Sequence, residues 1–399
     1  MPHFRFNLPQ ITLLTKDQKL AYNPKLPMLV TGGPGSGKTV VTIYRFLRAV
    51  RNEKKIILFT FNRTLIYSIK GTLRDRAEEL FGNLDQKQID DIVDNQLSTF
   101  FIWHKNNVCP FNDTADEDIV AGNFASLAAN GNYFEELFID EGQDLPPAVY
   151  SNIFTLADSV SVGADRAQNY RRYYEDDEVE DIILENLKKQ KHTQDQYLGE
   201  NFRNTMEIFE LARKFVPNNR RVQDMDVSEF RRGNKPDIRS GLDQLAQLDI
   251  IMQVISQNRN ANIGILLHFR NEFPVLRAHL EKNGYSCAQD APEASSYSYY
   301  YNDMNGDDEL VVKKKLCSPF ITTFESCKGL EFDIVIMPFF ENSEPAMRKL
   351  NREGRAYATQ NHYYVAVTRA KNEIFILCNE PPPSLPNVTE EEEEEELPF

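Results

Sequence analysis

The sequence has few cysteines, no long apolar run and no apolar leader, and each absence argues against a class of protein. The five cysteines are scattered, without a C-x-x-C pair, which argues against a disulfide framework or structural zinc and favours a reduced, cytoplasmic protein. No apolar run approaches the roughly 20 residues that cross a bilayer, so we expect no membrane association. The first residues, 1–5, lead into polar sequence instead of the apolar core of a signal peptide.

Positive charge is also scarce. The chain has 45 Lys and Arg against 60 Asp and Glu, a net charge of −15, which argues against nucleic-acid binding because nucleic acids are polyanions. Seven of the acids, however, form one unbroken run at residues 390–396, and subtracting them leaves about −8. A local basic groove is compatible with that total, so composition leaves the class of partner open.

The 399 residues are enough for two or three domains, and strand-like and helix-like segments alternate along them. This alternation predicts an α/β fold with parallel sheets. The predicted strands are residues 28–30, 55–61, 136–140, 159–163, 263–268, 333–337 and 374–378, and the clearest predicted helices are 40–50, 206–215 and 272–283.

Three segments depart from this alternation. Residues 106–118 are polar and contain Pro110, which predicts a loop or a small insertion. Residues 295–308 are rich in Tyr, Ser, Asn and Asp without a helical period, and we expect a mobile loop, either a binding surface or plain solvent-exposed chain. From Pro381 a proline-rich stretch leads into the acidic run, which predicts a disordered tail.

The most informative segment follows the first predicted strand and precedes a predicted helix. It reads G-x-x-x-x-G-K-T, the pattern of a phosphate-binding P-loop, and a plain glycine-rich turn is the less favoured alternative. Glycines let successive backbone N–H groups surround phosphate oxygens at a helix N-terminus. In such a loop Lys38 reaches the β- and γ-phosphates and the Thr39 hydroxyl holds Mg²⁺. We therefore expect ATP to be bound by Gly32, Gly33, Pro34, Gly35, Ser36, Gly37, Lys38 and Thr39.

A second motif, at residues 137–144, is an apolar run that ends in acids. In a P-loop enzyme a carboxylate at this place binds the metal, and a neighbouring glutamate activates the attacking water. We therefore expect Asp140, together with Thr39, to hold Mg²⁺ and Glu141 to act as the base.

Further segments resemble, in the same order, the motifs of the UvrD/Rep/PcrA-type superfamily 1 DNA helicases. Residues 140–144 resemble the family's DEAQD, 162–168 its GDxxQ, 200–205 its NYRS, 323–333 its TxHxxKGLEF and 364–371 its YVAxTRAK. The resemblance implies that Gln168 and Arg203 contact the γ-phosphate and that Arg369 is the arginine finger. The expected catalytic residues are Lys38, Glu141, Gln168, Arg203 and Arg369.

The same resemblance implies the remaining contacts. Gln18, in a segment like the family's Q-motif, would read the adenine edge, Phe202 would pack on the adenine and Glu331 would contact the ribose. Tyr170 and Tyr173 either stack on bases or begin a packed helix. The expected DNA contacts are Thr60, Phe61, Asn62, Thr99, Tyr170 and Tyr173.

The chain also departs from the family pattern. Glu325 replaces the usual histidine of its motif, which places an acid near the expected DNA groove. Only about forty residues separate Thr99 from Asp140 and about 120 separate Arg203 from Thr323, where family members that unwind duplexes carry large insertions. We therefore expect two nearly bare RecA-like P-loop domains, residues 1–197 and 198–380, with a tail at 381–399.

The C-terminus reads Leu397-Pro398-Phe399 after the acidic run and resembles the tip of bacterial single-stranded DNA-binding proteins. A terminal Phe can fill an apolar pocket while its carboxylate and the acids meet basic residues around the rim. We expect docking to proteins with pockets for such tips. A solubilising tail, or a tail that folds back over a basic groove, are the alternatives.

These observations predict an ATP-dependent helicase or translocase that acts on single-stranded DNA, 3′→5′ by resemblance, in repair, replication or defence. Robust unwinding by the chain alone is not expected. The alternative is a partner-dependent regulatory ATPase subunit, a nucleotide switch within a nuclease, repair or phage-defence complex. A nucleotide-bound adaptor without turnover is less favoured, because the full catalytic set is present.

Overall fold

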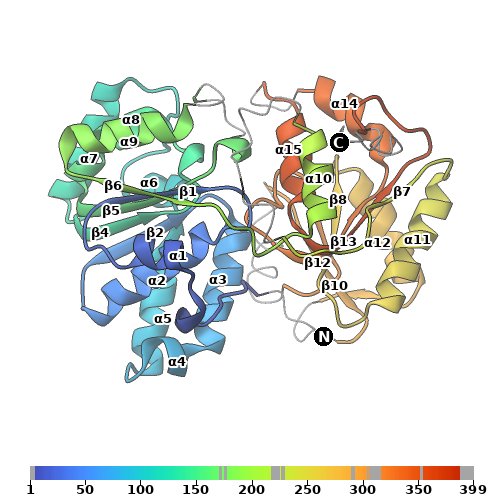
Figure 1. Ribbon diagram of the computed structural model, residues 1–399, viewed down its shortest axis with the longest axis horizontal. Helices are drawn as coiled ribbons and strands as arrows, with labels where there is room; N and C mark the ends of the chain where they lie inside the picture. The colour runs from blue at the N-terminus through green and yellow to red at the C-terminus, as the bar shows by residue number, and fades with distance from the viewer. Residues whose placement is uncertain are drawn as a thin grey trace, which may run out of the picture.

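Two parallel β-sheets, one in each half of the chain, organise the computed structural model of the protein (Figure 1). The structure describes residues 5–169, 173–174, 178–216, 225, 230–288, 293–302, 304, 316–350 and 354–386. Within these residues every pairing between the strands of the two sheets is parallel. The predicted α/β fold with two parallel-sheet domains is therefore confirmed.

The first sheet has six strands in the order β3-β2-β4-β5-β1-β6. They are β1 (Met28–Gly32), β2 (Ile56–Thr60), β3 (Leu97–Thr99), β4 (Phe134–Ile139), β5 (Ala157–Ala164) and β6 (Gln194–Leu198). Its helices are α1 (Lys16–Tyr22), α2 (Lys38–Arg51), α3 (Arg63–Asp75), α4 (Ala77–Phe81), α5 (Gln86–Asn95), α6 (Phe100–Asn107), α7 (Glu117–Ala129), α8 (Pro147–Asn152) and α9 (Val179–Gln190), and short 3-10 turns lie at η1 (Ile11–Leu13), η2 (Gly142–Asp144), η3 (Ile153–Thr155) and η4 (Arg166–Gln168).

The second sheet has seven strands in the order β7-β13-β12-β8-β11-β10-β9. They are β7 (Asp237–Arg239), β8 (Ile263–Leu267), β9 (Ser286–Cys287), β10 (Ser296–Tyr300), β11 (Phe320–Thr323), β12 (Phe332–Met337) and β13 (Ala370–Leu377). Its helices are α10 (Met206–Lys214), α11 (Gln244–Gln257), α12 (Glu272–Lys282), α14 (Ser343–Arg348) and α15 (Gln360–Val367), with a 3-10 turn at η7 (Phe340–Asn342).

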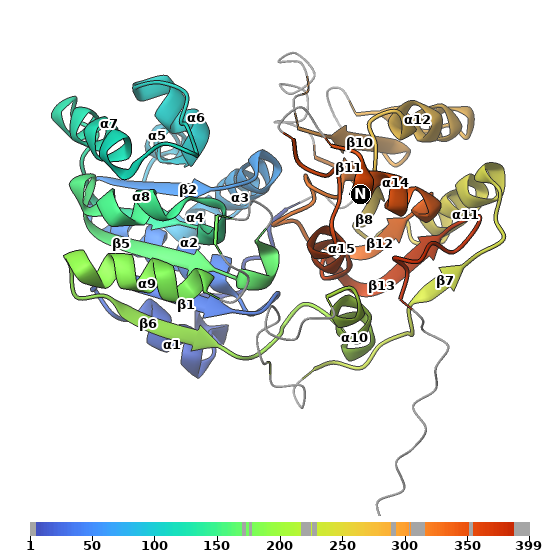
Figure 2. The ribbon, with the colours of Figure 1, turned by 90° about the horizontal axis from the view of Figure 1, so that it is seen from above.

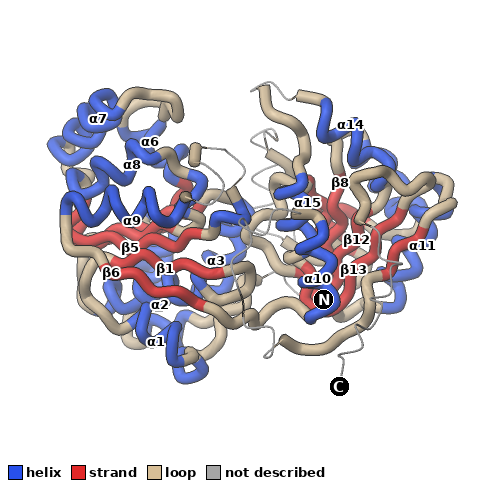
Figure 3. The backbone as a smooth tube through the Cα atoms, turned by 45° about the horizontal axis from the view of Figure 1, so that its top comes forward, coloured by secondary structure: helices blue, strands red, loops and turns tan. Residues whose placement is uncertain are grey.

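Helices cover both faces of the first sheet, with α8 and α9 on one side and α1 and α2 on the other (Figure 3). A strand covered on both faces needs apolar residues on both sides, and all five residues of β2 are buried. This explains why the predicted strands read as continuous apolar runs. The two domains stand side by side, and the chain passes from β6 to α10 between them (Figure 2). The limits 1–197 and 198–380 stay our proposal for the domains.

The motif segments begin where parallel strands end. The P-loop follows β1, the acids follow β4, Asp165 follows β5, and residues 324–331 follow β11. The carboxyl ends of parallel strands are where such folds bind ligands, because loops and helix N-termini meet there. The topology therefore brings segments from distant parts of the sequence to the edge that each sheet presents to the other domain.

The prediction of a loop over residues 295–308 is wrong for its first part, because residues 296–300 form β10. Tyr297 and Tyr300 are buried, and both strand neighbours of β10 pair with it in parallel. The absence of a helical period did not exclude a strand, and tyrosine favours strands. The end of the predicted loop, residues 305–308, lies outside the described residues. The other predicted loop lies between α6 and α7.

Two further predictions concern the chain as a whole. All five cysteines lie within the described residues, and none of them forms a disulfide. Within the described residues, no helix is both long enough and apolar enough to cross a membrane.

Candidate functional site

The loop between β1 and α2 depends on glycine. Gly35 and Gly37 have φ values of 70° and 93°, in the left-handed region. A Cβ at Gly35 would lie 2.7 Å from the Cβ of Arg203, and one at Gly37 would lie 2.4 Å from Nε2 of Gln18. The loop is therefore packed between the predicted adenine-reading residue on one side and the second domain's arginine segment on the other.

Lys38 points back into the loop that precedes it. Its Nζ donates to the carbonyl oxygens of Gly32 at 2.6 Å and Gly33 at 2.8 Å, and it lies 3.4 Å from Oδ2 of Asp165. The side chain is buried at the start of α2. The amine thus lies within the P-loop, where phosphate oxygens are alternative acceptors for its protons.

Thr39 and Asp140 form the candidate Mg²⁺ site. The Thr39 hydroxyl donates to Oδ2 of Asp140 at 2.9 Å, and the second carboxylate oxygen lies at 3.2 Å. Burial and the neighbouring carboxylate of Glu141 raise the pKa of Asp140 to about 7. A hydroxyl and a carboxylate beside a phosphate-binding loop are the hard oxygen donors that Mg²⁺ prefers, so this pair fits the ion.

Glu141 stands next to this pair in a strained backbone conformation, with φ 60°. Its Oε2 accepts from Nε2 of Gln143 at 2.5 Å and lies 3.6 Å from Nζ of Lys328. Burial alone would raise the pKa of Glu141, but the nearby cations, Lys328 foremost, outweigh burial and hold this pKa below its ordinary value. The buried carboxylate therefore stays ionised and able to accept a proton.

Gln168 and Arg369 meet across the domain interface. The side-chain amide of Gln168 donates to Oδ2 of Asp165 at 2.7 Å, and its oxygen accepts from Nη2 of Arg369 at 3.3 Å. Arg369 is 1% exposed and is also held by the carbonyl of Val365, to which its Nε donates at 3.0 Å. The second domain thereby inserts a guanidinium into the edge of the first domain.

Arg203, which also belongs to the second domain, pairs with Glu331. Its Nε and Nη2 donate to Oε1 of Glu331 at 2.9 and 2.6 Å, and Lys371 lies 3.6 Å from the other carboxylate oxygen. Burial would raise the pKa of Glu331, but Arg203 and Lys371 outweigh it and lower the pKa. Phe202 is 52% exposed, which leaves its ring available for stacking.

A cavity of about 360 Å³ lies between these groups, within the range of small-molecule sites. Most of the predicted nucleotide and catalytic residues line it: Gln18, Gly35, Gly37, Lys38, Thr39, Glu141, Gln168, Phe202, Arg203, Glu331 and Arg369. Asp140 does not line the cavity, but it accepts a hydrogen bond from Thr39, which does. Four residues of the loop do not line the cavity: Gly32, Gly33, Pro34 and Ser36. The carbonyl oxygen of Pro34 accepts a hydrogen bond from Asn201, and that of Ser36 accepts one from Gln18, which does line the cavity.

Sequence reasoning missed part of this cavity. Its wall also contains N-terminal residues and a group beside the second domain's arginines: Phe6, Asn7, Pro9, Leu13, Arg231, Lys371 and Asn372. For the N-terminal residues, the only sign in the sequence of a place in the cavity was that they lie shortly before Gln18. Arg231 donates to the carbonyls of Arg203 at 2.7 Å and Lys371 at 3.0 Å, but no local motif surrounds it.

Lys328 is the most consequential residue that sequence reasoning left unassigned, although it lies inside a quoted motif. It is fully buried, and its Nζ lies 2.6 Å from Oδ2 of Asp144, 2.7 Å from the carbonyl oxygen of Gln168 and 3.6 Å from Glu141. One cation from the second domain is thereby bound among three groups of the first.

The predicted DNA contacts take part mainly in structural contacts. Asn62 accepts from the amide of Thr64 at 2.9 Å, capping α3, and donates to the carbonyls of Ser326 at 2.6 Å and Lys328 at 2.9 Å across the interface. Thr99 caps α6 through the amide of Ile102. Thr60, Asn62 and Thr99 are all buried.

The three aromatic residues that we expected to contact DNA have different surroundings. The ring of Phe61 lies 5.7 Å from Nζ of Lys328. The Tyr173 hydroxyl donates to Asp113 at 2.6 Å. Tyr170 lies outside the described residues. The roles of all these residues toward DNA stay predictions.

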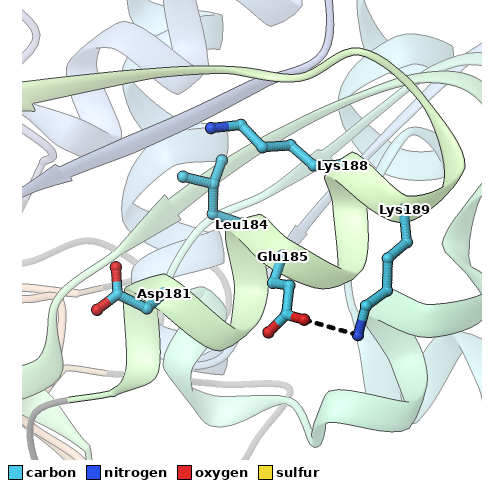
Figure 4. Close-up of a pocket in the computed structure, with 5 residues that line it drawn as sticks. All are labelled: Asp181, Leu184, Glu185, Lys188 and Lys189. Carbon is cyan, nitrogen blue, oxygen red and sulfur yellow. Dashed lines mark ion pairs between the residues drawn. The ribbon is translucent and has the colours of Figure 1, made fainter.

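A separate shallow hollow lies over α9 (Figure 4). All its lining residues come from one helix: Asp181, Leu184, Glu185, Lys188 and Lys189. Glu185 and Lys189 form an exposed ion pair at 3.0 Å, of a kind that contributes little to stability or binding. The hollow contains none of the predicted residues, so we place the functional site at the domain interface.

Two family models match the chain. The model of the UvrD/REP helicase N-terminal domain matches residues 14–118, and that of the UvrD-like helicase C-terminal domain matches residues 305–381. A search of curated proteins finds no match.

Among solved structures, Saccharomyces cerevisiae Dbp5 bound to RNA and ADP BeF3 is 12% identical, with a TM-score of 0.49 over 92% of this chain and 84% of that chain. The arterivirus nonstructural protein 10 helicase with DNA is 13% identical, with a TM-score of 0.39 over 93% and 64% of the two chains. The C-terminal domain of a possible DNA helicase from Lactobacillus plantarum is 16% identical, with a TM-score of 0.31 over 46% and 91%.

The two family matches follow the order of the motifs along the sequence. The first includes the P-loop, and the second includes the segment that carries Lys328, Glu331 and Arg369. The cavity between the two domains collects side chains from both matched regions. Both matched domains are those of UvrD/Rep-like superfamily 1 helicases, and they indicate an ATP-hydrolysing DNA helicase.

Proposed function

We propose that this protein is a minimal, cytoplasmic helicase-family translocase that hydrolyses ATP when single-stranded DNA is bound and moves along the strand 3′→5′. The observation that carries the proposal is the meeting of Arg369, from the second domain, with Gln168, from the first, at a cavity that Lys38 and Glu141 also line. Such a site is complete only when both domains contribute to it. Direction and pathway, whether repair, replication or defence, rest on the family resemblance alone.

The side chains divide the work of phosphoryl transfer. Glu141 accepts a proton from the water that attacks the γ-phosphorus, while the bond to the β-phosphate oxygen breaks to give ADP and phosphate. Lys38, Arg203 and Arg369 neutralise the negative charge that develops on the transferred group. Thr39 and Asp140 would hold Mg²⁺, and the ion would supply further positive charge to offset the charge of the phosphates.

The nucleoside contacts follow from the same cavity. Gln18, whose Nε2 donates to the carbonyl of Ser36 at 3.0 Å, is close enough to the loop to read the adenine edge. Phe202 offers its half-exposed ring to the base. Glu331 reaches the ribose once its pairing with Arg203 is exchanged for contact with the nucleotide.

ATP hydrolysis can be coupled to movement because the positive side chains around the γ-phosphate come from both domains. While the γ-phosphate is present, the arginines of the second domain and Lys38 of the first share one anion. Its release removes that shared partner and favours separation of the domains, and a cycle of closure and opening is what translocation requires. The chain lacks large insertions, so we propose strand translocation without robust duplex unwinding.

One observation favours a second function, a regulatory ATPase that switches with its nucleotide and depends on a partner. Thr60, Asn62 and Thr99, expected to contact DNA, are buried in structural contacts. We further propose that Leu397, Pro398 and Phe399, outside the described residues, dock into proteins that carry pockets for tails of single-stranded DNA-binding proteins. Their deletion is expected to leave turnover intact and weaken capture of such a protein; a changed basal rate instead indicates autoinhibition.

The steady-state ATPase rate with and without single-stranded DNA tests the proposal, with Lys38→Ala as the blank. Stimulation of tenfold or more by single strands is expected. A low rate that ignores DNA but rises with a partner protein supports the switch and contradicts the translocase.

A further inference from the structure

Arg231, which lines the nucleotide cavity, lies beside two other segments of the second domain. Its carbonyl oxygen accepts from the amide of Met206 at 2.8 Å, where α10 begins, and its backbone forms an isolated parallel bridge with Thr205. Figure 2 shows α10 beside β13, the strand that begins directly after Arg369. Arg231 is therefore close both to the residues that precede α10 and to those that begin β13.

The guanidinium of Arg231 bridges these two segments. Its Nη2 donates to the carbonyl oxygens of Arg203 at 2.7 Å and Lys371 at 3.0 Å. Its Nη1 donates to Oδ1 of Asn372 at 3.3 Å. The Nη2 amino group has two N–H bonds, so it can donate to both carbonyl oxygens at once. The side chain thereby ties the backbone of Arg203 to the backbone two residues after Arg369.

Arg203 and Lys371 also meet through their side chains. They pair with opposite oxygens of the Glu331 carboxylate, at 2.6 and 3.6 Å. The backbone bonds to Arg231 and the side-chain pairs with Glu331 form a closed ring. When the ribose takes the place of Arg203 at Glu331, one side of this ring opens. Arg231 then still holds the backbone from which the freed Arg203 side chain reaches the γ-phosphate.

A second connection between the same segments is buried. Asn204 donates from Nδ2 to the carbonyl oxygens of Thr368 at 3.1 Å and Ala370 at 2.6 Å, and its side chain has no exposed surface. Arg231, in contrast, is exposed at the cavity wall. Because Asn204 remains, loss of the Arg231 side chain is expected to leave the protein folded while Arg203 gains freedom of movement at the cavity.

We infer that Arg231 is a positioning residue for ATP hydrolysis, which holds Arg203 beside the Arg369 segment so that both guanidinium groups reach the same γ-phosphate. Cations stabilise a transferred phosphoryl group most when they are fixed in place before its charge develops. A misplacement of about 1 Å can lower a rate by as much as about 100-fold. The inference rests on the proposed function, because that function gives Arg203 its part in phosphoryl transfer.

The first test compares Arg231→Ala with wild type in single-turnover ATP hydrolysis, without DNA and with saturating single strands. The rate is expected to fall about tenfold, while affinity for a fluorescent ATP analogue stays within about threefold, since the P-loop contacts are unchanged. Arg231→Lys is expected to recover the rate to within about threefold of wild type, because an ammonium can also donate to two carbonyl oxygens.

Arg232→Ala is the matched control. It removes the same charge from the neighbouring side chain, which is 77% exposed and lies 3.7 Å from Glu207, and it is expected to change neither rate nor affinity. Thermal melting verifies that each variant is folded. If Arg231→Ala is unfolded, Arg231→Met replaces it, because methionine keeps much of the apolar stem without the donors, and the same tenfold loss is expected.

A double variant tests whether Arg231 acts through Arg203. Adding Arg231→Ala to Arg203→Ala is expected to lower the rate further by less than about twofold, because the side chain being positioned is already absent. A further tenfold loss overturns the inference. So does an Arg231→Ala protein that hydrolyses ATP within twofold of wild type. A loss of ATP affinity as large as the loss of rate shows direct nucleotide binding and also overturns it.

Binding of ADP with aluminium fluoride, a mimic of the phosphoryl group in transfer, tests the inference without turnover or DNA. Arg231→Ala is expected to bind this pair about tenfold more weakly than wild type and to bind ADP alone equally well. If single strands fail to stimulate wild type but the analogue shows this difference, the translocase proposal fails and the inference stands. If strands stimulate wild type and both proteins bind the analogue equally, the inference fails and the proposed function stands.

Discussion

The ammonium of Lys328 lies 2.6 Å from the Asp144 carboxylate, and the two residues, both buried, join the second domain to the first beside Glu141, the proposed general base. Removing one partner of a buried pair leaves an uncompensated charge, which typically costs about 3–5 kcal/mol. This ion pair therefore fixes the position of residues 324–331 relative to Glu141, and it joins the domain interface to the candidate site.

Lys328→Met, Asp144→Asn and their combination test this relationship as a double-mutant cycle. Lys328→Met is expected to destabilise the folded protein by about 3 kcal/mol, because Asp144 and Glu141 lose their buried cation. The double variant is expected to recover part of that loss, giving a coupling energy of about 1–3 kcal/mol. Denaturant unfolding measures each term, and additive effects would show that the contact carries no energy.

Glu141→Gln is expected to reduce turnover by about 100-fold or more, because an amide cannot take a proton from water. Nucleotide affinity is expected to stay within about threefold of wild type, since phosphate contacts belong to the P-loop. Lys38→Ala is the matched contrast, with loss of both turnover and affinity. Binding of a fluorescent ATP analogue and steady-state hydrolysis separate the two variants. Full activity in Glu141→Gln would remove this residue from the mechanism.

Gly35→Ala is expected to weaken nucleotide binding at least tenfold. The backbone has φ 70°, and the added Cβ would lie 2.7 Å from the Cβ of Arg203 and 2.8 Å from Oδ1 of Asn201, so the loop must shift. Gly82→Ala is the control, because it has φ 64° but no heavy atom within 4 Å of the added Cβ. Like Gly35 it has a positive φ, which residues with a Cβ rarely adopt, but it lacks the collision. Equal nucleotide affinity in the two variants would contradict the packing argument.

The sequence predicts best what is encoded by neighbouring residues. The P-loop and the acids after β4 each depend on a short contiguous motif after a buried strand, so their chemistry is visible locally. Lys328 was quoted within a motif, but its partner Asp144 lies on a different domain. That contact is a consequence of how the two sheets face each other. No local pattern contains it.

Contacts between distant parts of the chain also explain the other differences between the sequence-based expectations and the structure. Tyr299 looked like a loop residue because its strand, β10, is short, and the partners of that strand come from separate parts of the chain. Asn62 looked available to DNA because family motifs assign it by position. Its hydrogen bonds to Ser326 and Lys328 form only once the domains meet.

Glu272 is expected to make stability depend on pH. Burial raises its pKa to about 7, although the amides of His268 and Phe269 and the side chain of Asn342 donate to its carboxylate. A folded-state pKa above the unfolded value of about 4.3 favours the protonated form on folding. Its stabilising contribution is therefore complete below about pH 4 and is lost as pH rises through 7.

Glu272→Gln removes this titration while keeping an oxygen acceptor. The difference in unfolding free energy between variant and wild type is expected to change by roughly 3–4 kcal/mol in favour of the variant from pH 4 to pH 8. Denaturant unfolding across that range measures it, and taking the difference cancels the other titrating groups. A difference that stays constant with pH would show that Glu272 has an ordinary pKa in the folded protein.

The most direct test of the two-domain site is single-turnover ATP hydrolysis by Arg369→Ala and Arg369→Lys with saturating single-stranded DNA, after thermal melting has verified folding. Arg369 belongs to the second domain, yet donates to Gln168 at the edge of the first. If Arg369 is the arginine finger, hydrolysis falls about 1,000-fold or more in Arg369→Ala, while nucleotide affinity stays within about threefold. Arg369→Lys is expected to recover only part of the rate, because an ammonium lacks the planar fork. A folded Arg369→Ala that hydrolyses ATP within tenfold of wild type would contradict the claim that the two domains share one active site.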